Sequence, residues 1–172
     1  MSSIIKKSQK GFSLVEVLIY AALLIGITFF IVQSTVTLLK SHSKISLDRS
    51  VEYSAESAMN KMIAEIKNAS SINLAGSSLG TNPGTLFLSG TESGASYTIL
   101  FSIQNGVVVF SKNGAPNVPV TSSDVSVSNL MFRATSTLNS SAVKVDLTVS
   151  ATKSGFSKSL NLESFAVLRG SY

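Results

Sequence analysis

The sequence KKSQKGFSLVEVLIYAALLIGITFFIVQSTVTLL, residues Lys6–Leu39, joins a short basic leader to a long apolar run. Between Phe12 and Leu39 the only charged residue is Glu16. The 23 uncharged residues Val17–Leu39 would form a helix of roughly 35 Å at about 1.5 Å per residue. Since the hydrocarbon core of a bilayer is about 30 Å thick, the sequence predicts one membrane-spanning helix.

The distribution of basic residues predicts the orientation of this helix. Lys6, Lys7 and Lys10 precede the apolar run, and no Lys or Arg falls within it. Positively charged flanks stay on the cytoplasmic side of a membrane. We therefore expect a single pass through the cytoplasmic membrane, with everything after Lys40 outside.

Glu16 is the residue that an ordinary membrane span does not explain. A carboxylate inside an apolar helix costs roughly 2.5–3.5 kcal/mol on insertion scales. The helix dipole near the N-terminus returns only about 0.3–1 kcal/mol, so we expect a cationic partner. A cut just before Phe12 would create an α-amino group within about a turn of Glu16, in the same chain or in a neighbouring one.

The residues Lys10–Ile19, KGFSLVEVLI, carry a resemblance to a known family. They resemble the class III signal of type IV pilins and pseudopilins: a basic leader, Gly before the cut, Phe after it and Glu as the fifth mature residue. The resemblance implies cleavage between Gly11 and Phe12 by prepilin peptidase, a membrane aspartic peptidase, and N-methylation of Phe12. It also implies that Glu16 pairs with the N-terminal amine of an adjacent subunit during filament assembly.

The same resemblance implies a pilin-like α+β fold, in which a long N-terminal helix packs on an antiparallel β-sheet. We expect a cleaved leader at 1–11, a transmembrane and assembly helix at 12–39, an amphipathic continuation at 40–70 and a β-rich head at 71–172. The implied partners are the prepilin peptidase and N-methyltransferase, other pilin subunits, the inner-membrane assembly platform and membrane lipid. The implied location after assembly is an extracellular pilus or a periplasmic pseudopilus.

Two other kinds of N-terminal segment share a basic leader and an apolar run. An ordinary signal peptide has a 7–15-residue apolar region closed by a small-residue cleavage site, and this run is longer and has no such site. A plain single-span anchor is the remaining alternative, and it has no use for Glu16. It would carry a binding module or adhesin that never polymerises.

From Lys40 the helical pattern becomes amphipathic. Apolar residues recur at steps of three and four and form one stripe, and no proline interrupts residues 12–70, so one helix of some 55 residues is predicted. The residues of this stripe are Ile45, Val51, Ala55, Ala58, Met59, Met62, Ile63, Ile66 and Ala69.

After residue 84 the period of apolar residues changes to two, which predicts β-strands with one buried face. Gln104-Asn105-Gly106 has the composition of a hairpin turn, and a proline-bearing connection at 113–119 should interrupt the ladder. The predicted strands are Thr85–Ser89, Ser96–Ile103, Val107–Lys112, Val125–Ala134, Ala142–Ala151 and Ser159–Leu168.

The residues that carry enzymatic or metal chemistry do not form a recognisable set. The run Gly76-Ser77-Ser78-Leu79-Gly80 matches a nucleophile elbow, but that motif needs a strand before it, a helix after it and later acidic and His partners. The one histidine, His42, lies upstream near the membrane, and the chain has no cysteine. We expect no enzyme activity, no cofactor and no metal.

The net charge of +5 is partly due to the leader, and removing the three leader lysines would reduce it to +2. Basic residues of the head, from Lys112 to Arg169, are spread over several strands, which argues against DNA as a partner. The helix from Arg49 to Ala69 and the strands after it resemble minor pilins of the W and J types. We therefore expect a structural subunit, and a minor one, of a type IV pilus, with a type II secretion or competence pseudopilin as the alternative.

Overall fold

The computed structural model of the chain describes residues 11, 13–137 and 140–169. Helix α1 covers Leu14–Asn68, 55 residues, and eight strands follow it. Residues Met1–His42 and Ser43–Tyr172 form two separate compact units, and α1 contributes to both. The predicted α+β class, with one long N-terminal helix and antiparallel strands, is confirmed.

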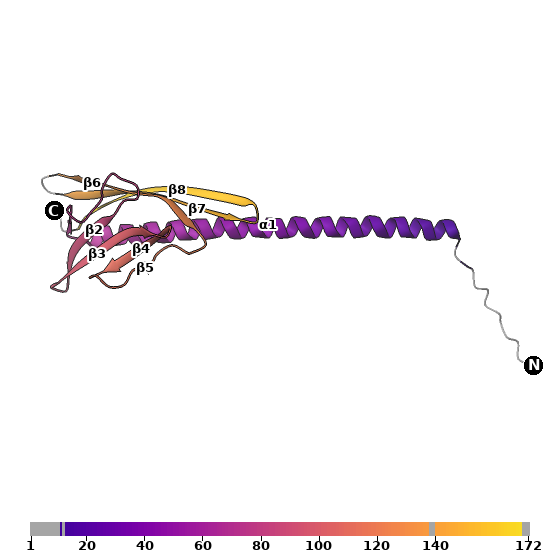
Figure 1. Cartoon of the computed structure of the whole chain (residues 1–172), viewed down its shortest axis with the longest axis horizontal. Helices are drawn as coiled ribbons and strands as arrows, with labels where there is room; N and C mark the ends of the chain where they lie inside the picture. Colours follow the sequence, from indigo (N-terminus) through magenta and orange to yellow (C-terminus); the bar gives the residue numbers. More distant parts are fainter. Residues whose placement is uncertain (1–10, 12, 138–139, 170–172) are drawn as a thin grey trace, which may run out of the picture. The chain divides into compact units, whose positions relative to one another are not determined.

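The strands divide into two antiparallel sheets where the sequence predicted one (Figure 1). The first has five strands in the order β1-β2-β3-β4-β5: Ser71–Ile72, Leu86–Glu92, Ala95–Gln104, Val107–Lys112 and Val118–Pro119. The second has three in the order β6-β7-β8: Ser126–Ser136, Ser141–Lys153 and Phe156–Val167. The connection predicted to interrupt the ladder does so only in part, because its last residues, Val118 and Pro119, pair with Phe110 and Val109 as β5. Proline has no N–H to donate and is confined to edge strands, and the two sheets divide after Pro119.

The hairpin turns have the backbone that their residues favour. At the predicted turn, Asn105 and Gly106 have φ values of +52° and +76°, which matches a type I′ turn with two left-handed residues. Ser93-Gly94 and Ser154-Gly155 have the same pair of positive φ values. These turns set the registers of β2–β3 and β7–β8, and β3, β7 and β8 extend beyond the predicted strands.

The core of the head lies between the apolar stripe of α1 and the inner faces of the two sheets. Most of the predicted stripe is buried, with Val51, Ala55 and Met62 completely inaccessible to solvent. Ile45 was wrongly included, because its side chain is 53% exposed and Leu47 is buried instead. Ile45 lies six residues before Val51, about one and two-thirds helical turns, so it cannot share the face of Val51.

The edge strand β6 of the three-stranded sheet is covered by loop backbone. Along β6, Gly80 N donates to Phe132 O and Gly84 N donates to Leu130 O, each at 2.8 Å. Asn82 Oδ1 accepts from Leu130 N at 3.1 Å. A Cβ on Gly84 would lie 3.0 Å from Leu130 O, so the loop can approach β6 closely because residue 84 has no side chain.

Candidate functional site

Of the residues that the sequence predicted to be functional, the structure describes Gly11 and Glu16, and only Glu16 lies within α1. Gly11 is exposed and lies outside the helix, which begins at Leu14. Val17 N donates to Ser13 O at 3.1 Å, which places Ser13 at the N-cap and Glu16 three residues later. This spacing is the S-x-x-E pattern of a capping box. The predicted leader residues Lys6, Lys7 and Lys10 and the predicted methylation residue Phe12 lie outside the described residues.

Glu16 has a hydroxyl partner on the same helix. Tyr20 donates its hydroxyl proton to Glu16 Oε1 at 3.2 Å, one turn along α1. No ion pair involves Glu16 among the residues that the structure describes. The carboxylate is therefore held by a neutral donor, which gives less stabilisation than a cation would. This role of Tyr20 was not predicted, although its i,i+4 spacing to Glu16 can be read from the sequence.

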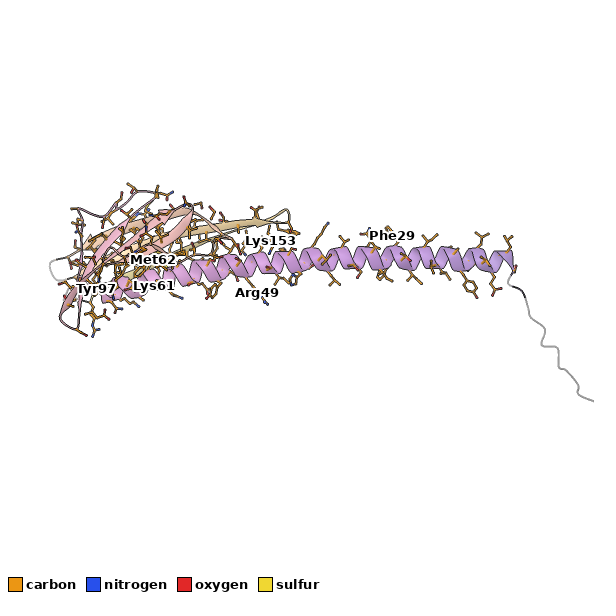
Figure 2. All side chains as sticks on the ribbon, turned by 60° about the horizontal axis from the view of Figure 1, so that its bottom comes forward. Phe29, Arg49, Lys61, Met62, Tyr97 and Lys153 are labelled. Atoms are coloured by element: carbon orange, nitrogen blue, oxygen red, sulfur yellow. The ribbon has the colours of Figure 1, made fainter. Side chains whose placement is uncertain are left out.

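The apolar segment that follows Glu16 is exposed along its length in the described part of the chain. Its large side chains are at least 41% exposed, and Phe29 projects away from the helix in Figure 2. The helix is long and apolar enough to cross a membrane. The hydroxyls of Thr28, Thr35 and Thr37 each donate to the carbonyl four residues earlier, at 2.8–2.9 Å. Polar groups satisfied within the helix suit an environment without water.

A second group of polar residues lies at the C-terminal end of α1, on the head. The Tyr97 hydroxyl donates to Asn68 O at 2.9 Å, and Lys112 Nζ lies 4.8 Å from the centre of the Tyr97 ring. Lys112 Nζ also donates to Glu92 Oε2 at 2.9 Å. A cavity of about 490 Å³ opens beside these groups. Figure 2 shows Tyr97 and Lys61 at this end of the head.

The ionisation of these groups follows from their surroundings. Burial, with a smaller effect of the Glu65 carboxylate, raises the pKa of Tyr97. The hydrogen bond to Glu92 raises the pKa of Lys112. Both shifts keep the proton on the side chain near neutral pH, so neither group is prepared to act as a base. The cluster ties the helix end to β2, β3 and β4, and we assign it a structural role.

A ladder of alternating charges crosses the outer face of the three-stranded sheet. Arg133 on β6 and Lys144 on β7 both pair with Asp146, and Lys144 also pairs with Glu163 on β8 at 2.7 Å. Asp146 is only 6% exposed, so it needs these cations. The hydrogen bonds to Glu163 and then Asp146 raise the pKa of Lys144. Each carboxylate in this ladder is already paired with a cation.

The serines of the nucleophile-elbow match serve the loop around them. Ser78 Oγ shares a hydrogen bond with Thr81 Oγ1 at 2.9 Å, and Ser77 Oγ accepts from Phe87 N at 2.9 Å. Among the described residues, no group of three or more His, Asp or Glu side chains is arranged to hold a metal ion. The absence of a catalytic set was a prediction from the sequence and stays one.

Comparison with known proteins adds no relative. A scan against protein-family models gives no match, and searches of curated proteins and of solved structures find no protein similar to this chain.

Proposed function

We propose that this chain is a structural subunit, a minor one, of a type IV pilus or a related pseudopilus. The observation that carries the proposal is Glu16, a carboxylate in the first turn of an exposed apolar helix, which has a hydroxyl partner and no cationic partner among the described residues. Close by, the sequence Gly11-Phe12 resembles a prepilin cleavage site. Cleavage there by prepilin peptidase would create the missing cation as an α-amino group on Phe12, which the same enzyme would then methylate.

Assembly would follow from the chemistry of the helix. In lipid, helices gain little from hydrophobic contact with one another, so they associate by close packing and by satisfying polar groups. Apart from the nearby backbone of its own helix, a Cβ on Gly26 would meet no atom of the described residues within 4 Å, so the space beside this residue is open to a neighbouring helix. An amine from an adjacent subunit would give Glu16 a charged partner and would fix the register between helices.

N-terminal mass spectrometry of the chain purified from its native membrane tests the processing step. We expect a mature chain that starts at N-methylated Phe12. A chain that retains residues 1–11 would overturn the assembly mechanism. It would favour the second candidate, a single-span anchored binding module.

A substitution series tests the role of Glu16 separately. We expect Glu16→Leu to be inserted and cleaved like the native chain but to enter filaments at least tenfold less efficiently. Tyr20→Phe is the control, because it removes the hydroxyl partner and keeps the carboxylate, and it should assemble normally. Equal filament incorporation of Glu16→Leu would refute the pairing.

A further inference from the structure

Four strands lie at the edges of the two sheets in the described part of the chain: β1, β5, β6 and β8. β1 and β5 are only two residues long, and loop backbone covers β6, where Gly84 N donates to Leu130 O at 2.8 Å. Strand β8, 12 residues long, pairs only with β7. No loop backbone of the described residues bonds its outer edge. Such an edge is a template for pairing with another strand.

The side chains of β8 are also incompletely covered. Leu160 and Leu162 face the core and are only half-buried, whereas their partners on β7, Val149 and Leu147, are fully buried. On the outer face of the strand, Phe165 is 71% exposed. An added strand would cover the half-buried leucines and satisfy the open backbone groups in a single step.

The two ends of the β8 edge carry opposite charge. Near the start of the strand, Lys158 Nζ lies 3.9 Å from both the Asp48 and the Glu52 carboxylate of α1. Because the single Lys158 ammonium group is shared between these two carboxylates at a long distance, negative charge is in excess at this end. This end therefore attracts a basic side chain.

Near the end of the strand the excess is positive. A hollow of about 500 Å³ is lined by Lys67, Arg169 and the exposed apolar side chains Phe165 and Val167. Neither Lys67 nor Arg169 forms an ion pair with a described residue. This end therefore attracts a carboxylate, with apolar surface beside it.

We propose that the β8 edge binds an extended segment of another polypeptide as an added strand. The segment carries a basic side chain at the Asp48–Glu52 end, a carboxylate at the Lys67–Arg169 end, and apolar residues at alternate positions between them. Antiparallel addition is the more stable arrangement of such a strand.

A second copy of this chain is the other occupant to consider. Two copies would match these charges only with their β8 strands antiparallel, and hence with their 43–68 helical segments antiparallel. In the filament proposed above, the α1 helices of neighbouring subunits lie side by side and parallel, so two copies do not meet in this way. The choice of a different polypeptide thus rests on the proposed function, whereas the open edge itself does not.

Binding of designed peptides to the full chain in detergent micelles tests the inference. The probe is the capped peptide Glu-Thr-Val-Thr-Val-Thr-Val-Thr-Lys with a fluorescent label, in which the valines and the two charged ends share one face of the strand. The comparison peptides are the same peptide with Glu at both ends and one with proline at the centre. By anisotropy we expect the probe to bind roughly two- to fivefold more tightly than the Glu/Glu peptide. We expect the proline peptide to bind at least about tenfold more weakly, because proline removes a ladder donor.

Variants and hydrogen exchange connect the binding to β8. Glu52→Lys should reverse the preference in favour of the Glu/Glu peptide, whereas Glu92→Lys, the same charge change on β2, should not. Binding of the probe should slow amide exchange in 156–167 and leave 107–112 unchanged. Equal binding of all three peptides, or unchanged exchange in β8, would overturn the proposal. So would a chain that forms dimers without peptide and protects β8 by doing so. None of these outcomes affects N-terminal processing, which tests the proposed function.

Discussion

Gly90 on β2 is the position where the addition of one methyl group should have the clearest consequence. A Cβ on Gly90 would lie 2.5 Å from both Cζ and the hydroxyl oxygen of Tyr97. Relaxed carbon contacts are about 3.5–4.0 Å, so the ring must move by roughly 1 Å. The ring is held in place by its hydrogen bond to Asn68 O and by Lys112 above its face. Gly90→Ala therefore forces the hydroxyl away from the end of α1.

The size of the effect follows from three contributions. Overpacking costs typically about 1–3 kcal/mol, and the loss of a hydrogen bond costs about 0.5–1.5 kcal/mol. The lower entropy of the unfolded alanine chain offsets about 0.4–1 kcal/mol. We expect Gly90→Ala to lower the free energy of unfolding of the head by about 2 kcal/mol.

The assay is denaturation of the full chain in detergent micelles, followed by circular dichroism because the chain contains no tryptophan. In a Tyr97→Leu background the methyl group has no ring to displace, so the penalty of Gly90→Ala should vanish. Ser96→Ala, at an exposed neighbouring position, is the control and should change stability by less than about 0.5 kcal/mol. An equal penalty for Gly90→Ala in both backgrounds would refute the contact with Tyr97 as its cause.

Three further predictions concern the head. Met62→Ala should lower the free energy of unfolding by about 2–5 kcal/mol, because Met62 is fully buried. Ile45→Ala should lower it by less than about 0.5 kcal/mol in the same denaturation assay. Similar values for the two variants would contradict the placement of Ile45 outside the core. Burial raises the pKa of Tyr97, so above pH 10.0 the folded chain keeps the Tyr97 proton that the unfolded chain loses. The free energy of unfolding should therefore fall as pH rises, and Tyr97→Phe should make that fall shallower. Gly84→Ala should lower the free energy of unfolding by about 1–3 kcal/mol, because its Cβ would lie 3.0 Å from Leu130 O. It should also speed amide exchange in β6, which hydrogen-exchange mass spectrometry would detect or exclude.

The elements set by local pattern were predictable from the sequence. The apolar run and the stripe after it predicted one helix, and α1 covers Leu14–Asn68. The Asn105-Gly106 turn and the alternation around it predicted β4 at Val107–Lys112, which the structure reproduces. In these segments, neighbours in sequence determine the conformation.

Contacts made by irregular backbone were not predictable. The loop at 70–85 has the composition of any exposed loop, yet Gly80, Asn82 and Gly84 bond the edge of β6 some 46–52 residues away. The two-residue strands β1 and β5 are too short to show a period. At the candidate site, the predictions for Gly11, Phe12 and Glu16 came from the resemblance to pilins, and they stay predictions. The hydrogen bond from Tyr20 to Glu16 was found only in the structure.

The order in which the head can form follows from where its contacts lie along the chain. β6, β7 and β8 are consecutive hairpin partners, whereas Lys153 reaches Ser46 across 107 residues and Arg169 N bonds Lys67 O. Local hairpins close quickly, and contacts between distant residues form late. The apolar stripe of α1 must therefore stay uncovered until the last strand is available. Until then, this stripe is the surface on which folding and aggregation compete.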